Sequence, residues 1–276
     1  MVSFIDCHLS LRRCSPFNGG KFEGWGTSFC WWPNRIGYLD ELSEQAAKLF
    51  FDPKEGLGLN IIRYNIGGGD DPTHHHITRT DSMVPGYAIN PSHDANGYHW
   101  SYDWNADQNQ RNVLMKVAEC YGKDLIVEGF SNSPPYFMTN SGCSSGSVNA
   151  GENNLREDAY GAFASYLADV AQHFSKEWGI HFQSMTAMNE PDTEYWHALS
   201  DKQEGCHFDP GESQSVMIIA LREALDERGL NDILISGTDE TGIDCQINSI
   251  NSLSEVARET IARIDTHSYL EGDNEG

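Results

Sequence analysis

The segment FQSMTAMNEPDTEYW at residues 182–196 ends an apolar run on an amide, a carboxyl group and a proline. At the carboxyl end of a buried strand, such side chains would face the loops where barrel enzymes hold their chemistry. Glu190 would then act as a general acid and base, because a carboxyl group buried among aromatic rings holds its proton more readily than one in water. Asn189 would donate a hydrogen bond to a ligand hydroxyl group. The alternative is a loop carboxylate beside a helix-capping amide.

Two further polar residues follow the apolar run LNIIRYNIG at 59–67. Arg63 would pair with a nearby carboxylate and donate to a ligand hydroxyl group, or it would form a structural ion pair at the rim of the sheet. Both interpretations remain open. Asp70, just past three glycines, would accept hydrogen bonds from ligand hydroxyl groups or serve as a turn carboxylate.

Several aromatic residues and histidines are candidates for the walls of a pocket. His267 and Tyr269 alternate in the run DTHSY at 265–269, so on a strand they would face the same way. They would form a pocket wall, unless His267 is a hydrogen-bonded core residue. Trp25, Trp31 and Trp32 are either core residues or, for at least one of them, a flat platform for a ring-shaped ligand.

Three consecutive histidines, His74, His75 and His76, raise the question of a metal site. Consecutive side chains rarely converge on one ion, and no Cys or carboxylate follows at ligand spacing nearby. We therefore predict a solvated loop, with no metal and no other cofactor.

Strand-like and helix-like segments alternate along the chain, which predicts parallel β/α units. No glycine-rich phosphate turn follows the first strand-like run, so a (β/α)8 TIM barrel is favoured over an open doubly wound sheet. Six strands are predicted, two short of a closed barrel, so we expect a barrel that is incomplete after its sixth strand. The expected strands are 22–29, 59–67, 124–131, 182–189, 233–241 and 265–269, and the expected helices are 39–51, 105–122, 154–178, 213–229 and 252–264.

Composition narrows the range of partners. The net charge of −23 repels nucleic acids and anionic membranes, no apolar run is long enough to span a bilayer, and the first residues lack the apolar core of a signal peptide. Seven cysteines are present. Cys143 and Cys206 stand in Gly- and Ser-rich loops, which predicts disulfide bonds and an oxidising compartment, against the alternative of seven free thiols.

Six motifs together resemble glycoside hydrolase family 30, and most of all its endo-β-1,6-galactanase-like branch. They are FEGWGTSFCWW, LNIIRYNIGGGD, FSNSPPYFMTNSGCSSG, TAMNEP, QEGCHFD and DTHSY, and the similarity runs from Gly24 to Tyr269. The resemblance implies a retaining glycosidase, monomeric and extracellular, that acts on β-1,6-linked galactan without a cofactor. It also implies a β-sandwich beside the barrel, so residues 1–21 are expected to belong to that side domain and residues 22–276 to the incomplete catalytic barrel.

The resemblance also implies roles for individual residues. Glu190 matches the general acid/base and Asn189 a ligand of the −1 sugar. The Arg and Asp of the second strand correspond to Arg63 and Asp70, and the pair on the last strand to His267 and Tyr269.

Two departures from the family pattern stand out. Ser131 occupies the place of a Trp found in other members, and the nucleophilic Glu of the family's seventh strand has no counterpart. Glu240 and Glu271 are the nearest substitutes, and neither is assigned that role. Three hypotheses follow: a galactanase fragment or a family relative of another specificity, a non-catalytic carbohydrate-binding protein, and an incomplete product that does not fold alone.

Overall fold

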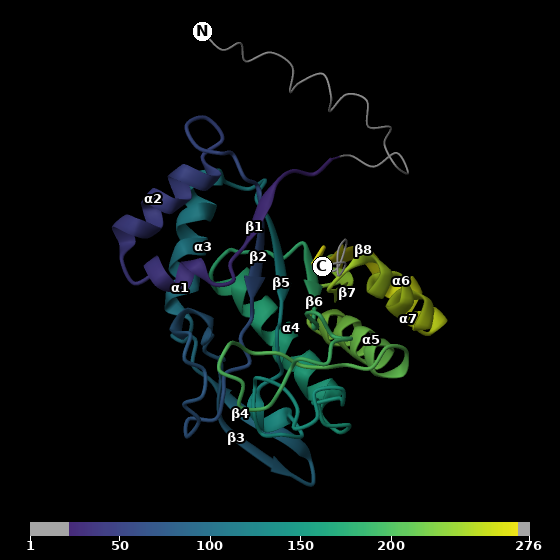
Figure 1. The fold of residues 1–276 in the computed structure, drawn as a ribbon. Coiled ribbons are helices and arrows are strands. Elements are labelled where there is room, and N and C mark those ends of the chain that lie inside the picture. The colour runs from purple at the N-terminus through teal and green to yellow at the C-terminus, as the bar shows by residue number, and fades with distance from the viewer. Residues whose placement is uncertain (1–21, 270–276) are drawn as a thin grey trace, which may run out of the picture.

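The computed structural model describes residues 22–269. Six strands form one parallel sheet, which curls into half of a barrel wall (Figure 1). In sheet order these are β1 (Gly26–Ser28), β2 (Ile61–Asn65), β5 (Ile126–Phe130), β6 (Ser184–Thr186), β7 (Leu234–Glu240) and β8 (Ile261–Thr266). Since each strand follows its sheet neighbour with a helical connection, the α/β prediction is confirmed. Within the described residues, β1 and β8 are the two edges of this sheet.

Helices pack against one face of the sheet, with α2 and α3 near β1 and β2, and α5, α6 and α7 near β7 and β8 (Figure 1). Within residues 22–269, two short 3-10 turns lie in the loops, at Thr80–Ser82 and Tyr136–Met138. The helices are α1 (Trp32–Ile36), α2 (Asp40–Phe51), α3 (Gln108–Tyr121), α4 (Tyr160–Glu177), α5 (Glu212–Glu227), α6 (Ile243–Ser252) and α7 (Glu255–Thr260).

The alternation of side chains along β2 explains why the two faces of the sheet differ. Ile62 and Tyr64 are fully buried in the core between sheet and helices, where the rings of Tyr64 and Phe174 are 5.1 Å apart. Arg63 lies between them in sequence and therefore faces the concave side. Its register partner on β5 is Glu128, so charged side chains from neighbouring strands meet on that side.

No strand or helix is predicted between the strand at 59–67 and the helix at 105–122. In the structure this segment contains a two-stranded antiparallel sheet, made of β3 (Ala88–Asp94) and β4 (Gly97–Tyr102). It projects at the end of the molecule opposite α2 (Figure 1). Tyr102 stacks on Trp104 at 4.5 Å, and Trp104 stacks on His173 of α4 at 3.7 Å. These aromatic contacts anchor the hairpin to the barrel. The sequence does not predict this hairpin, because few of the hairpin's side chains enter the core and most of them are polar.

The C-terminal part of the sheet differs from the prediction. The structure has α6, which was not expected, and a short α7 that ends where β8 begins at Ile261. The predicted helix at 252–264 was therefore too long. His267 and Tyr269 follow the strand and do not belong to it. Their backbone N–H groups donate to the carbonyls of Glu240 and Thr241, at 2.8 and 3.0 Å.

The cysteine prediction is wrong for the two loop residues. Cys143 and Cys206 are buried and unpaired, and the other cysteines within residues 22–269, which are partly exposed, are unpaired too. Cys7 and Cys14 lie outside the described residues. Among the described helices, none combines the length and the apolar character that crossing a membrane requires.

Candidate active site

A cavity of about 730 Å³ opens at the carboxyl end of the sheet. This volume is typical of a site for a small ligand. Its walls combine hydrogen-bonding side chains with exposed aromatic rings, and Glu190 is the one carboxylic acid among the described residues that line it. The lining includes Arg63, Asn189, Glu190, Tyr195, His267 and Tyr269.

Glu190 is held in a backbone conformation that few residues other than glycine adopt, with φ of +48°. Its N–H donates to the carbonyl of Asp239 at 2.8 Å, and its own carbonyl accepts from Trp196 Nε1 at 3.0 Å. These bonds fix the turn after β6 and leave the side chain 9% exposed at the cavity. Strained backbone of this kind occurs preferentially at functional sites.

The carboxylate of Glu190 has two side-chain partners. The Tyr195 hydroxyl donates a hydrogen bond to Oε2, and His267 Nδ1 lies 3.2 Å from Oε1. The other ring nitrogen of His267 lies 3.2 Å from Asp239 Oδ1. His267 therefore bridges two carboxyl groups, an arrangement that orients Glu190 and connects it to a second ionisable group.

Arg63 is the cation on the concave side of the sheet. Its guanidinium pairs with Asp239, lies 3.3 Å from Glu128 Oε1, and stacks 3.5 Å above the Phe130 ring. Burial works to lower the pKa of Arg63, but the charges of Asp239 and Glu128 outweigh it and raise that pKa above its ordinary value. Arg63 therefore stays charged. It forms the structural ion pairs of one interpretation and also lines the cavity, and its contact with a ligand stays a prediction.

Asn189 is oriented by Arg63. Its Oδ1 accepts hydrogen bonds from both terminal guanidinium nitrogens at 3.3 Å. The Nδ2 group is then left to donate to a ligand in the cavity.

Asp239 joins Arg63 to His267, although no pattern in the sequence predicts it as a site residue. Asp239 lies one residue before the end of β7 and has φ of +66°, a positive value like that of Glu190. Nearby, burial and the neighbouring Glu128 raise the pKa of Asp265 to about 8. The guanidinium of Arg63 therefore interacts with several acidic side chains on the concave side of the sheet.

Not every predicted site residue reaches this cavity. Trp25 is 67% exposed and lies outside its lining, since its indole packs edge-on against Phe22. Ser131 is fully buried, and its hydroxyl donates to backbone carbonyls of the loop. The carboxyl group of Glu240 accepts from Gln214 and Ser249, so it faces the helices and not the cavity. Glu271 lies outside the described residues.

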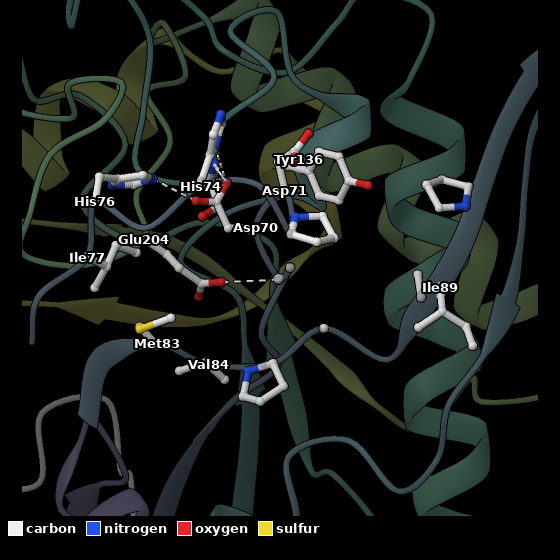
Figure 2. A pocket seen from close by; sticks show the side chains of 18 of the residues that line it. Asp70, Asp71, His74, His76, Ile77, Met83, Val84, Ile89, Tyr136 and Glu204 are labelled. Atoms are coloured by element: carbon white, nitrogen blue, oxygen red, sulfur yellow. Dashed lines mark hydrogen bonds and ion pairs between the residues drawn. The ribbon is translucent and has the colours of Figure 1, made fainter. Parts of the chain in front are cut away.

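Asp70 lines a second cavity, of about 680 Å³ (Figure 2). His76 Nε2 lies 2.6 Å from its Oδ2, and Ser144 N–H donates to its Oδ1 at 3.0 Å. The prediction of a solvated histidine loop is wrong for His74 and His76, whose side chains are 25% and 10% exposed. His75 is exposed as predicted.

Glu204, also in this cavity, makes the stability of the chain depend on pH. It is 1% exposed, accepts from Gly69 N–H at 3.2 Å, and burial raises its pKa from 4.5 to about 8. Between these pH values the folded chain holds a proton that the unfolded chain releases, so this group's effect lowers stability as pH rises from 4.5 through 8. We measure the drop in melting temperature from pH 5 to pH 8 for each protein. We expect this drop to be several degrees smaller for Glu204→Gln than for the wild type.

The matched control is Glu223→Gln, on the exposed face of α5. It should reproduce the wild-type slope of melting temperature against pH. Equal slopes for wild type and Glu204→Gln would contradict the assignment of this pH dependence to Glu204.

The sequence pattern of O-Glycosyl hydrolase family 30 matches residues 21–252, which include β1 to β7 and the whole lining of the Glu190 cavity up to Gln203. This chain belongs to family 30. Its fold agrees, because the catalytic domain of GH30 xylanase C from Talaromyces cellulolyticus superposes with a TM-score of 0.69 at 21% identity, over 91% of this chain and 54% of that one. A conserved exported protein from Bacteroides fragilis also superposes with a TM-score of 0.69, at 25% identity, over 81% of this chain and 44% of that one.

Two family 30 relatives have described activities. An endo-β-1,6-galactanase of Hypocrea rufa is 37% identical over 274 aligned residues, which cover 92% of this chain and 54% of that protein. An exo-β-1,6-galactobiohydrolase of Bifidobacterium longum subsp. longum is 26% identical, covering 92% of this chain and 22% of that protein. This chain spans about half the length of the first of these relatives, 54%, and 22% of the second.

Proposed function

We propose that this family 30 chain carries the acid/base half of a retaining glycosidase active site that cleaves β-1,6-linked galactan. The observation that carries the proposal is the placement of Glu190. Its carboxyl group is oriented by Tyr195 and His267 in the cavity at the carboxyl end of the sheet. The similarity to an endo-β-1,6-galactanase supports the choice of substrate.

In the proposed reaction, Glu190 gives its proton to the glycosidic oxygen as the bond to the anomeric carbon breaks. A second carboxylate attacks that carbon and forms a glycosyl ester, and Glu190 then takes a proton from the water that hydrolyses the ester. The two carboxyl groups must lie roughly 5–5.5 Å apart for this retaining chemistry. Among the described residues Glu190 alone lines the cavity as an acid, and Glu240 faces away from it.

The second carboxylate would come from strands that extend the sheet beyond β8. The open edge of β8 favours this, since Ile264 on that strand is 60% exposed and Val256 on α7 is also 60% exposed. An uncovered edge strand with exposed apolar neighbours is a surface that further strands can cover. The closed (β/α)8 barrel and the monomeric state belong to the same proposal. Residues 1–21, which were expected to belong to a side domain, lie outside the described residues.

Sugar binding would use the remaining lining. Arg63 and Asn189 face the cavity with donors suited to ring hydroxyl groups. Tyr195 and Tyr269, 48% and 73% exposed, offer ring faces on which the apolar side of a galactose unit can stack. A neutral polysaccharide also suits a chain with a net charge of −23, and we place the enzyme outside the cell.

The test compares residues 1–276 with the full product of the gene, each supplied with β-1,6-galactooligosaccharides, xylan or β-1,6-glucan. We expect the full product to hydrolyse the galactooligosaccharides at least about tenfold faster than the other two, and to release products of retained anomeric configuration. NMR of the first product formed measures both.

Each other outcome has a distinct meaning. Preference for xylan or β-1,6-glucan would overturn the substrate while leaving a glycosidase. Residues 1–276 and the full gene product could both bind galactooligosaccharide saturably and hydrolyse none. That outcome would support the rival function of a non-catalytic carbohydrate-binding protein. The presence of one acid in the described cavity lining already favours this rival over an enzyme that needs no further residues. Inverted products would overturn the retaining mechanism.

A further inference from the structure

Four side chains with metal-binding donor atoms converge beside the second cavity, which Asp70 lines. The match to the family assigns no role to these four side chains. Asp70, His74, His76 and Cys143 each direct one ligand atom to a common point, and these atoms all lie within 4.8 Å of one another. Figure 2 shows Asp70 with His74 and His76 directed toward it. The first three residues come from the loop after β2, and Cys143 comes from the loop after β5.

Two of the separations between ligand atoms are close to those around a tetrahedral ion. Zinc–ligand bonds of 2.0–2.3 Å place neighbouring ligand atoms about 3.3–3.7 Å apart. His74 Nδ1 lies 3.2 Å from Asp70 Oδ1, and Cys143 Sγ lies 3.3 Å from His76 Nε2. The 2.6 Å contact between His76 Nε2 and Asp70 Oδ2 is closer, so these two atoms would separate by about 1 Å around an ion.

The second ring nitrogen of His76 shows that Nε2 is available as a ligand. His76 Nδ1 lies 2.6 Å from the carbonyl oxygen of Ser200, so it must carry a proton and donate it. A neutral ring then has a lone pair on Nε2, directed at a carboxylate oxygen and a sulfur. Such acceptors repel one another unless a cation, either a proton or a metal ion, lies between them. Binding of the far ring nitrogen by a carbonyl is typical of metal-ligating histidines.

Backbone and hydroxyl groups contact two of the other three ligands, Asp70 and Cys143. Ser144 N–H donates to Asp70 Oδ1 at 3.0 Å, and Leu199 N–H donates to Cys143 Sγ at 3.4 Å. Ser145 Oγ also lies 3.2 Å from Cys143 Sγ. The N–H groups of Ser144 and Leu199 favour a negatively charged carboxylate and thiolate, which are the forms that bind a metal.

We propose that Asp70, His74, His76 and Cys143 bind one Zn²⁺ ion at a structural site. One carboxylate, two imidazoles and one thiolate are ligands that zinc takes in tetrahedral geometry, whereas Ca²⁺ and Mg²⁺ require a larger set of oxygen ligands. Four protein ligands leave no open coordination position, so the ion is structural and does not activate water.

The site connects three loops, one of which forms a wall of the Glu190 cavity. The segment 195–203 contributes Tyr195, His197 and Ser200 to that cavity. The same segment contacts the zinc ligands through the Ser200 carbonyl and the Leu199 N–H group. The ion would therefore order the sugar-facing wall without touching the sugar.

The test uses the untagged chain, stripped of metal with a chelator and kept under a reducing agent that does not bind zinc. We expect one Zn²⁺ per chain by elemental analysis after gel filtration. We also expect Co²⁺ to produce a thiolate-to-cobalt charge-transfer band in the near ultraviolet. The band should disappear in Cys143→Ser, and Zn²⁺ should fall to near zero per chain in His76→Ala.

Matched controls use neighbouring residues outside the cluster. His75→Ala, exposed in the same loop, and Cys206→Ser, buried and unpaired, should keep the ion and the band. A wild-type chain that binds no Zn²⁺, or whose Co²⁺ complex lacks the thiolate band, overturns the proposal, whatever the folding of the variants. Stability that depends on pH but not on Zn²⁺ would assign the cation to a proton on His76.

Discussion

Replacement of Glu190 by Gln is expected to lower the hydrolysis of β-1,6-galactooligosaccharides by about 10²–10⁴-fold in the full gene product. Gln keeps the size of the side chain and its contacts with Tyr195 and His267, but it cannot give or take the proton. Binding of the oligosaccharide should change little. Initial rates and calorimetric titration with the same oligosaccharide separate the two effects.

The control for Glu190→Gln is Glu194→Gln, which removes the same charge from an exposed position in the same loop. It should retain wild-type rates. A dinitrophenyl galactoside adds a readout specific to acid/base chemistry, because its leaving group needs no proton, and added azide can then take the place of the activated water. Wild-type turnover of the oligosaccharide by Glu190→Gln, or a loss that azide does not relieve, would contradict the assigned role.

The strands that carry the site could be predicted from the sequence because they are buried on one face and bounded by glycines and prolines. The run before Asn189 and the run containing Arg63 are short and apolar, and both form parallel strands at the predicted places. The motifs NEP and DTHSY also lie together in space, since Glu190 and His267 are 3.2 Å apart. The predicted pairing of these motifs depended on the family resemblance and not on periodicity.

Other parts of the site depend on tertiary contacts that no local pattern contains. Asp239 lies near the end of β7 in the run SGTDET, where nothing in the sequence distinguishes it from Glu240 beside it. In the structure, Asp239 pairs with Arg63, whereas the carboxyl group of Glu240 faces the helices. The histidine cluster shows the same limit, because Cys143 is distant in sequence and no count of local spacing would connect it with His76.

Replacement of Arg63 by Met is expected to destabilise the chain by about 3 kcal/mol at pH 7, toward the lower end of the range for a broken buried ion pair because its side chain is 19% exposed. Asp239 and Glu128, 3% and 8% exposed, would be left without their cation. Met keeps the apolar contact with the Phe130 ring, so the loss isolates the charge. Urea unfolding followed by circular dichroism measures the free energy of unfolding.

The matched control is Arg263→Met on β8, whose ion-pair partner Glu23 is 53% exposed. A pair of this kind contributes about 0–1 kcal/mol, and its loss should be nearly independent of pH. For Arg63→Met the loss should shrink at pH 5, because the stranded carboxyl groups can take up protons there and lose the charge that makes their burial costly.

The pH dependence also separates two accounts of why Arg63 lies on the concave side. If it serves mainly to neutralise the buried acids, adding Asp239→Asn and Glu128→Gln to Arg63→Met should recover much of the stability that Arg63→Met loses. The triple variant has no buried carboxylate left without its cation at these positions. If Arg63 serves mainly through packing, Arg63→Met and the triple variant should lose the same amount of stability, at pH 5 and at pH 7. The close approach of Asp239, Glu128 and the proton-bearing Asp265 to one guanidinium favours the first account. The same cation would then keep Asp239 charged and His267 oriented toward Glu190, so that fold stability and proton transfer depend on one side chain.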